Sequence, residues 1–305
     1  MTTDDSVLER NLTVLVKTYE RRDCLARLLA SVRRFYARVP ILVVDDSAAP
    51  LDPVPPGISY LHEPHNSLGI AGGRNFGLRH VETEFVLICD DDMVFVPDTD
   101  LRKMLRVVET TRFDIVACRV LDHDPWRDIP LGHSRFEGTA EIVGHDVVRR
   151  LGASSGTLDG LPIYDVVAQF FVAGVDRLGP DPWDARLNLQ EHVEFFLVMK
   201  ERGLLSTRLS DVVVEHHPRL PQHYYDSRHG QRAHYDLLWQ EQRGIERKVF
   251  VGRPFTRRDR IIIYYPALVR FLARRALDTF TQRSFRPRVK RLHLTRRRIT
   301  RIRRR

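Results

Sequence analysis

Runs of apolar residues that end in acidic or hydroxyl side chains constrain the fold of this chain more than any other feature. Three such runs, with the polar residues that follow them, are 12–16 with Thr18, 41–44 with Asp45 and Asp46, and 85–88 with the aspartates at 90–92. Helical spacing of apolar residues in segment 24–36 separates the first two runs. Strands that alternate with helices indicate a parallel α/β sheet, and ligands bind such sheets at the carboxyl ends of the strands.

The sequence "LICDDDMVFVPD" places three consecutive carboxylates, Asp90, Asp91 and Asp92, directly after one of these runs. Adjacent carboxylates repel and raise one another's pKa unless a cation or a dense set of donors neutralises them. We therefore expect a positive partner at this point of the sheet. The alternative is a solvated turn, because Asp is common in turns and at helix starts.

The second half of the chain has a different rhythm. From about residue 122 shorter β-like segments follow one another, and then a helix near residues 191–203 and a strand in "DVVVEHHP". Residues 222–244 show a helical pattern that ends at Gly244. The segment "IIIYYPALVRFLARRAL" mixes apolar and basic residues, so it either binds a surface as an amphipathic helix or packs on the body.

The net charge of +9 is concentrated at the C-terminus. Residues 283–305 contain 12 Lys and Arg and no acidic residue, which leaves 37 basic against 40 acidic residues in 1–282. A basic block of this kind suits phosphates, either in nucleic acid or in anionic lipid headgroups. It says little about the chemistry of the body.

Targeting features and cysteines give simpler expectations. The N-terminal sequence "MTTDDSVLER" is acidic and polar, unlike a signal peptide, and no stretch approaches the roughly 18 uninterrupted apolar residues of a membrane span. We expect a cytoplasmic protein, with association to a membrane through the basic tail as a further option. Cys24, Cys89 and Cys118 lie in apolar patterns without metal-ligand spacing, which predicts small core residues.

Several separated motifs together resemble one enzyme family. They are "VKTYERRDCLARLLASVRRFY", "VVDDS", "GGRNFGL", "LICDDDMVFVP", "EHVEFF" and "VVVEHH". In this order, over roughly residues 11–220, they resemble the inverting GT-A glycosyltransferases of the family-2 type, and most closely the β-1,4-N-acetylgalactosaminyltransferases that act on gangliosides. The resemblance implies a GT-A fold, which is a Rossmann-like α/β fold with a mainly parallel central sheet, flanking helices and a smaller antiparallel portion on the acceptor side.

The same resemblance implies a domain organisation. A catalytic domain would span residues 1–220, with a nucleotide-binding half at about 11–121 and an acceptor-side half at about 122–220. A helical extension over 221–282 and the Arg-rich tail over 283–305 would follow, and the resemblance does not cover these segments.

For the nucleotide, the resemblance implies that Asp46 accepts a hydrogen bond from the uracil ring and that Asp45 supports it. Arg74 would pair with acidic groups near the nucleotide or with the pyrophosphate. The first strand ends in "KTYE" where many family members have a T-x-Y-N-like sequence, so only Thr18 transfers, as a base or ribose contact.

For the phosphates, the triple aspartate would act as a DxD motif. Asp90 or Asp91 would reach the ribose, and Asp92 would ligate a divalent cation that bridges the two phosphates. His216 would occupy the position of the third metal ligand in the enzymes that this sequence resembles, and the neighbouring His217 is an alternative ligand. A carboxylate with an imidazole suits Mn²⁺ better than Mg²⁺, although both remain open.

An inverting transfer also needs a base within hydrogen-bond reach of the acceptor hydroxyl. The sequence "NLQEHVEFFLVMKERG" offers Glu191, His192 and Glu194 at the start of a helix. Glu191 and Glu194 are one turn apart, so both are expected on nearly the same side. The enzymes that this sequence resembles retain a Glu more dependably at the position of Glu194. As the base we therefore favour Glu194, then Glu191, then His192.

The expected function is metal-dependent transfer of a sugar, GalNAc or another hexose or HexNAc, from a UDP-sugar to a hydroxyl of a glycan, glycolipid or small-molecule acceptor. A sugar-nucleotide-forming nucleotidyltransferase is one alternative, but "VKTYERRD" lacks the glycine-rich loop such enzymes carry after the first strand. A non-enzymatic protein that binds RNA or anionic membrane through its tail is another. Nucleic acid is the less expected partner, because that alternative leaves the ordered acidic motifs without a role.

Overall fold

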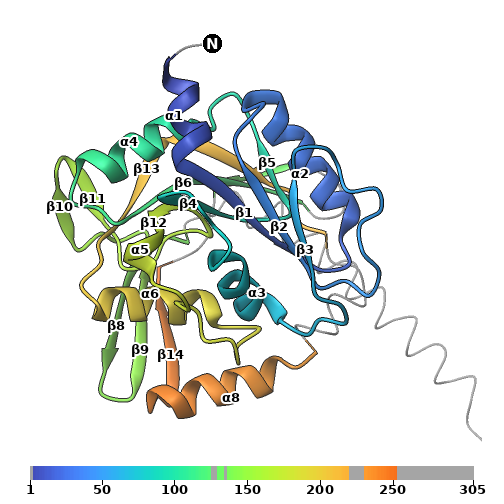
Figure 1. Cartoon of the computed structure of the whole chain (residues 1–305). Helices are drawn as coiled ribbons and strands as arrows, with labels where there is room; N and C mark the ends of the chain where they lie inside the picture. Colours follow the sequence, from blue (N-terminus) through green and yellow to red (C-terminus); the bar gives the residue numbers. More distant parts are fainter. Residues whose placement is uncertain (1–2, 125–128, 134–135, 220–229, 253–305) are drawn as a thin grey trace, which may run out of the picture. The chain divides into compact units, whose positions relative to one another are not determined.

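A nine-stranded sheet forms the centre of the protein in this computed structural model (Figure 1). Its strands are β1 (Leu12–Thr18), β2 (Ile41–Asp45), β3 (Ser59–His62), β4 (Phe85–Asp90), β5 (Met93–Phe95), β6 (Ile115–His123), β7 (Pro130–His133), β12 (Phe170–Gly174) and β13 (Ser206–His216). They lie in the order β3-β2-β1-β4-β12-β6-β13-β5, and β7 pairs with β6. The first four strands in this order are parallel, β12 runs antiparallel between β4 and β6, and β13 is parallel to β6. The expectation of a mainly parallel α/β sheet is confirmed.

The structure describes residues 3–124, 129–133, 136–219 and 230–252. These residues belong to a compact unit that extends over residues 1–259, and a second unit covers residues 260–305. The amphipathic segment 261–277 and the basic tail 283–305 therefore lie outside the described residues. Within the described part, no helix has both the length and the apolarity needed to cross a bilayer.

Helices cover both faces of the central sheet (Figure 1). One face packs against α1 (Thr3–Asn11), α2 (Arg22–Phe35) and α4 (Leu101–Thr110), and the other packs against α3 (Gly69–Leu78), α5 (Val175–Leu178) and α6 (Glu191–Glu201). The side chains of β1 alternate accordingly, with Val14 and Val16 in the first core and Leu15 in the second. Both faces of the strand are buried, which explains why residues 14–16 are all apolar.

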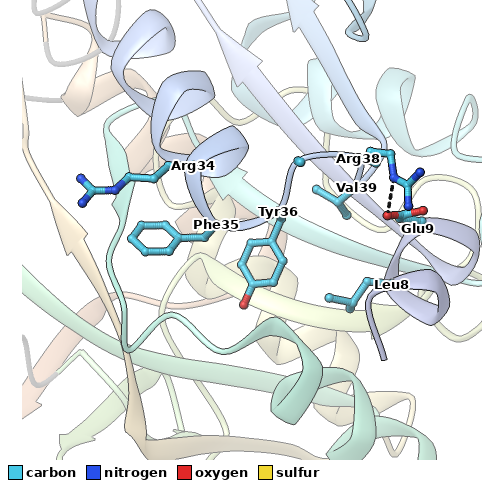
Figure 2. Close-up of a pocket in the computed structure, with 8 residues that line it drawn as sticks. Leu8, Glu9, Arg34, Phe35, Tyr36, Arg38 and Val39 are labelled. Carbon is cyan, nitrogen blue, oxygen red and sulfur yellow. Dashed lines mark hydrogen bonds and ion pairs between the residues drawn. The ribbon is translucent and has the colours of Figure 1, made fainter. Parts of the chain in front are cut away.

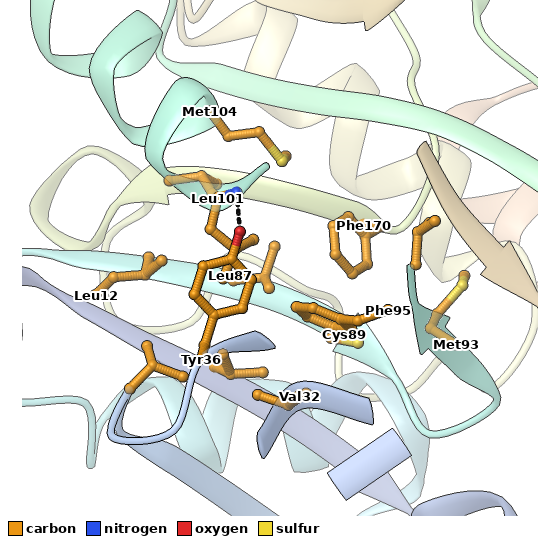
Figure 3. Close-up of a cluster of buried hydrophobic side chains, with 14 of the residues drawn as sticks. Leu12, Val32, Tyr36, Leu87, Cys89, Met93, Phe95, Leu101, Met104 and Phe170 are labelled. Carbon is orange, nitrogen blue, oxygen red and sulfur yellow. Dashed lines mark hydrogen bonds between the residues drawn. The ribbon is translucent and has the colours of Figure 1, made fainter. Parts of the chain in front are cut away.

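Tyr36 is part of the first hydrophobic core and links it to the residues around the start of α4 (Figure 3). Its ring packs edge-on against Phe95, and its hydroxyl donates to the carbonyl of Thr99 at 2.6 Å and accepts from the amide of Leu101 at 2.9 Å. The same core contains Cys89, and all three cysteines are buried and free, as the sequence predicted. The helix α2 begins at Arg22, so Asp23 lies in its first turn and does not cap it.

Two smaller sheets complete the described part. One contains β8 (Gly138–Val143), β9 (Asp146–Leu151) and β14 (Arg247–Val251), and the other contains β10 (Gly156–Leu158) and β11 (Leu161–Ile163). The segment predicted to be a helical extension does contain a helix, α8 (Arg232–Arg243), which ends at Gly244 in the left-handed conformation. It continues, however, into β14, which pairs in parallel with β9. This strand was not expected, because its short and largely exposed sequence carries little apolar periodicity.

Candidate active site

The carboxyl ends of the central strands bring the predicted residues together. Thr18 pairs in register with Asp45 across β1 and β2, and Lys17 pairs with Asp90 across β1 and β4. The Thr18 hydroxyl donates to Asp91 Oδ2 at 2.7 Å, across 73 residues of sequence. The alternation of strand and helix thus converts separated motifs into one polar edge, as expected for a parallel sheet.

The positive partner of Asp91 and Asp92 is Arg21, a residue that was not predicted from the sequence. Its guanidinium group donates from Nε to Asp91 Oδ2 at 3.2 Å, from Nη2 to Asp91 Oδ1, and from Nη1 to Asp92 Oδ2 at 2.8 Å. All three side chains are buried. No local pattern identifies this arginine, since it lies in the loop after β1 and reaches its partners only through the β1–β4 pairing.

The pKa values of Asp91 and Asp92, which both contact Arg21, are shifted in opposite directions. Burial raises the pKa of Asp91 to about 7, against the attraction of Arg21 and with a further contribution from the neighbouring Asp92. Burial acts in the same direction on Asp92, but Arg21 and His216 outweigh it and hold the pKa of Asp92 well below its usual range. Asp92 is therefore the carboxylate that stays ionised.

A second buried pair lies at the end of β2. Asp46 accepts from the Gly69 amide at 3.1 Å and forms an ion pair with Lys17, whose ammonium group also donates to the Thr18 carbonyl at 2.7 Å. Burial lowers the pKa of Lys17 and raises that of Asp46, and their mutual attraction opposes both shifts. Glycine at residue 73 leaves room for this ion pair, since a Cβ there would collide with the Lys17 side chain in its present position.

Asp45 has a supporting set of contacts of its own. Its carboxylate accepts from the Ser47 amide at 2.9 Å and from the Tyr60 hydroxyl at 2.8 Å. These bonds fix the turn that follows β2, next to the Asp46 carboxylate.

Arg74 connects the triple aspartate with α6. Its Nη2 donates to Asp90 Oδ1 at 2.6 Å, and its Nη1 lies 3.7 Å from Glu191 Oε1. The side chain is only 3% exposed, yet Nε and Nη1 have no hydrogen-bond partner among the described residues. A buried guanidinium group with unused donors is suited to an anionic ligand.

The three candidate bases on α6 face different neighbours. Glu194 accepts from Trp239 Nε1 at 2.6 Å and from Arg243 Nε and Nη2 at 2.8 and 2.7 Å, so its carboxylate joins α6 to α8. His192 Nε2 lies 2.7 Å from the Val167 carbonyl. Glu191 is the one whose carboxylate lies beside Arg74. The two glutamates thus have different partners although they are one helical turn apart, because α8 supplies both partners of Glu194.

Asp92 and His216 meet at the junction of β5 and β13. His216 Nε2 lies 3.5 Å from Asp92 Oδ1, and its Nδ1 lies 2.8 Å from Asp122 Oδ1 on the adjacent strand. Burial disfavours the charged imidazole, but Asp92 and Asp122 outweigh it and raise the pKa of His216 to about 10. A carboxylate oxygen and an imidazole nitrogen at this separation fit one divalent cation, and a second carboxylate that orients the imidazole is typical of metal sites.

His217, the alternative ligand, points elsewhere. Its backbone amide donates to the Asp92 carbonyl at 2.8 Å, while its ring lies against Glu215 and His123. Asp122 was missed by the sequence analysis, because an aspartate near the end of a strand carries no distinctive signal by itself.

A hollow between α1 and the end of α2 lies apart from these residues (Figure 2). Its lining includes Leu8, Phe35 and Val39, and an ion pair of 2.9 Å joins Arg38 to Glu9 at its rim. It adjoins the residues that precede β1 and β2, whereas the polar residues described above follow these strands. We assign it no part in the site.

Comparison with known proteins gives a consistent set of relatives. The family described as glycosyl transferase family 2 matches residues 13–145. The β-1,4 N-acetylgalactosaminyltransferase 1 of Rattus norvegicus is 36% identical over 211 residues, which cover 67% of this chain and 38% of that protein. The β-1,4 N-acetylgalactosaminyltransferase 2 of Mus musculus is 32% identical over 217 residues, which cover 70% of this chain and 40% of that protein. The chain thus spans well under half the length of these relatives.

Solved structures show the same fold at low sequence identity. S. aureus TarS 1–349 in complex with UDP-GlcNAc is 19% identical with a TM-score of 0.51, over 70% of this chain and 60% of that chain. The structure of GalNAc-T7 with UDP, GalNAc and Mn²⁺ is 12% identical with a TM-score of 0.50, over 69% of this chain and 44% of that chain. The expected GT-A fold is confirmed.

Proposed function

Because the chain belongs to glycosyl transferase family 2, we propose that it transfers a sugar from a UDP-sugar donor to an acceptor hydroxyl with inversion at the anomeric carbon. The observation that carries the proposal is the Asp92–His216 pair at 3.5 Å, next to the Thr18–Asp91 hydrogen bond, at the carboxyl edge of the sheet. The relatives are glycosyltransferases, so the nucleotidyltransferase and the purely binding alternatives are not favoured.

The donor occupies the strand edge in this proposal. Asp46, supported by Asp45, accepts from the uracil ring, while Thr18 and Asp90 or Asp91 contact the ribose. Arg74 directs its unused donors toward the pyrophosphate. The UDP-GlcNAc bound by TarS and the UDP bound by GalNAc-T7 support a uridine nucleotide.

Asp92 and His216 are the proposed metal ligands, and Asp122 orients the imidazole of His216. The Mn²⁺ in the GalNAc-T7 structure supports a divalent cation, and the mixed carboxylate and imidazole ligands favour Mn²⁺ over Mg²⁺. A cation bound there would stabilise the negative charge that develops on the departing UDP.

Glu191 is the proposed base, ahead of Glu194 and His192. Glu194 already accepts hydrogen bonds from Trp239 and Arg243, so its carboxylate is engaged by α8. Glu191 lies beside Arg74, which also binds Asp90, so this carboxylate adjoins the proposed donor site. The guanidinium group of Arg74 also orients this carboxylate, as a proton acceptor requires.

The donor sugar and the acceptor follow from the relatives alone. GalNAc is the first choice because relatives at 36% and 32% identity are named as N-acetylgalactosaminyltransferases, with another HexNAc or hexose as alternatives. The acceptor would be a glycan, a glycolipid or a small molecule.

A cytoplasmic location, with the tail 283–305 bound to an anionic membrane, belongs to the same proposal. Deletion after Gln282 should then abolish sedimentation with anionic vesicles at low salt without affecting donor hydrolysis, and unchanged sedimentation would refute the membrane role.

A UDP-release screen over donor sugars tests the central proposal, because donor hydrolysis needs no acceptor. UDP-GalNAc, UDP-GlcNAc, UDP-Gal and UDP-Glc are each incubated with Mn²⁺ or with a chelator. We expect Mn²⁺-dependent UDP release from at least one of them. Asp92→Asn should lose Mn²⁺-dependent UDP affinity, and full affinity in that variant would contradict the metal assignment. Absence of release from every donor, in protein that binds UDP, would contradict the transfer function.

A further inference from the structure

Two histidines and a glutamate form a compact cluster at the ends of β6 and β13. His217 Nε2 lies 2.9 Å from Glu215 Oε2, and His123 Nε2 lies 3.5 Å from the same oxygen. One ligand atom from each of the three residues lies within 4.8 Å of the others. The two imidazole rings stack with their centroids 3.9 Å apart.

The strand geometry separates this cluster from the donor site. In the parallel pair β6–β13, His216 lies in register with Asp122, and these two side chains bond to each other. Because side chains alternate along a strand, Glu215 leaves β13 on the other side from His216, and His123 leaves β6 on the other side from Asp122. His217 follows directly after β13, and its ring contacts Glu215. The two groups of residues therefore occupy opposite sides of the same two strand ends.

From this arrangement we propose that His123, Glu215 and His217 form a second metal site, which binds Zn²⁺ or a similar first-row transition metal. Zinc lies about 2.0–2.2 Å from nitrogen and oxygen ligands, so tetrahedral ligand atoms are about 3.3 Å apart. The separations of 2.9 and 3.5 Å bracket this value. Two imidazoles with one carboxylate favour zinc over magnesium or calcium, which prefer oxygen ligands.

Burial and anchoring support binding at this place. The side chains of His123 and His217 are only 7% and 11% exposed, whereas that of Glu215 is 27% exposed and gives the cluster its opening to solvent. The backbone of His217 is fixed by its amide bond to the Asp92 carbonyl at 2.8 Å and by Arg27 Nη2, which donates to its carbonyl at 3.1 Å. Ligands held on strand ends with a fixed backbone are preorganised for a metal.

A metal bound by these three residues would link the ends of β6 and β13. These strands carry Asp122 and His216 respectively, so a metal on the opposite side would hold their ends at a fixed separation. This inference does not depend on the proposed sugar transfer, and its test uses no activity measurement.

Cobalt is a suitable probe, because four-coordinate Co²⁺ absorbs visible light far more strongly than six-coordinate Co²⁺. We expect the full chain, freed of metal and titrated with Co²⁺, to gain one equivalent with the intense four-coordinate spectrum, and Zn²⁺ to displace it. His123→Gln and Glu215→Gln should each weaken that binding by at least about 10-fold, since even residues that only support ligands change affinity by this much. Circular dichroism confirms the fold of each variant, and the second variant serves if the first does not fold.

His80→Ala provides the matched control, because His80 is exposed and lies after α3, where it contacts Phe76. It should retain the four-coordinate spectrum and the Zn²⁺ stoichiometry of the unaltered chain. Co²⁺ binding that is only six-coordinate, or a four-coordinate spectrum that survives in both glutamine variants, would overturn the proposal.

Discussion

Two regions of the molecule bury carboxylates against arginines, but with different balances of charge. Between α6 and α8, Glu194 accepts from Arg243 through both oxygens and from the Trp239 indole, so its hydrogen-bonding capacity is met by these two neighbours. The contact closes the space between two helices. Its chemistry is complete without any ligand.

At the strand edge the balance is different. One guanidinium group, that of Arg21, spans both Asp91 and Asp92, and the pKa of Asp91 stays raised to about 7 despite this contact. Arg74 likewise divides its contacts between Asp90 and Glu191. Arginine–carboxylate contacts thus complete the packing of α6 against α8. At the strand edge the same kind of contact leaves more carboxylates than guanidinium groups, and this excess of negative charge suits a cationic ligand.

The largest expected effect separates the two glutamates of α6. Glu191→Gln should lower the transfer rate by a factor on the order of 10² to 10⁴ with UDP affinity intact, because the amide cannot accept the acceptor proton. Glu194→Gln should change the rate far less and act on stability instead. Transfer and UDP binding are measured separately for both variants. A wild-type transfer rate in Glu191→Gln would return Glu194 to the position of leading candidate.

The next effect concerns Arg21. Arg21→Gln should lower the free energy of unfolding of the metal-free protein by about 3–5 kcal/mol, because it leaves Asp91 and Asp92 buried without their cation. Urea denaturation in a chelator at about pH 8, where both aspartates ionise in the unfolded chain, gives the value. A loss below about 1 kcal/mol would mean that other groups neutralise this edge.

A smaller loss of stability is expected at the contact between α6 and α8. Arg243→Gln should cost about 1.5–3 kcal/mol, the range for hydrogen bonds to a charged group, because Glu194 and Arg243 keep some access to water. The matched control is Lys103→Gln, which removes an exposed ion pair with Asp211 and should change stability by less than about 0.5 kcal/mol. Equal losses in the two variants would show that the α6–α8 contact is no stronger than a surface pair.

The last prediction is a dependence of stability on pH. The pKa of His216 is raised to about 10 in the folded protein by Asp92 and Asp122, so the folded state holds this proton more tightly than the unfolded chain. Its contribution is therefore complete below about pH 6.5 and is lost as pH rises toward 10. In a chelator, the free energy of unfolding should fall between about pH 8 and 9.5, where Asp91 is already mostly ionised. His216→Gln should remove most of this decrease, and an unchanged slope would contradict the assignment.

The sequence predicted the parts of the molecule that local patterns determine. Buried parallel strands require continuous apolar runs, and their carboxyl ends carry Thr18, Asp45 and the three aspartates, so the apolar runs alone were enough to locate this edge of the sheet. Arg21 and Asp122 could not be found in this way, because their partners come from other strands. The choice between Glu191 and Glu194 also depends on α8, whose Trp239 and Arg243 follow more than 40 residues later.

The position of β12 has a consequence for synthesis of the chain. This fully buried strand, Phe170–Gly174, inserts between β4 and β6, although both of those strands leave the ribosome well before it. Until residue 174 emerges, the nascent nucleotide-binding half presents an unpaired edge on β4 that is rich in β-branched and aromatic residues. Such an edge is a template for pairing with other chains. A ribosomal pause or truncation before residue 170 should therefore yield a chaperone-dependent fragment, whereas a fragment that includes β12 covers the exposed edge of β4.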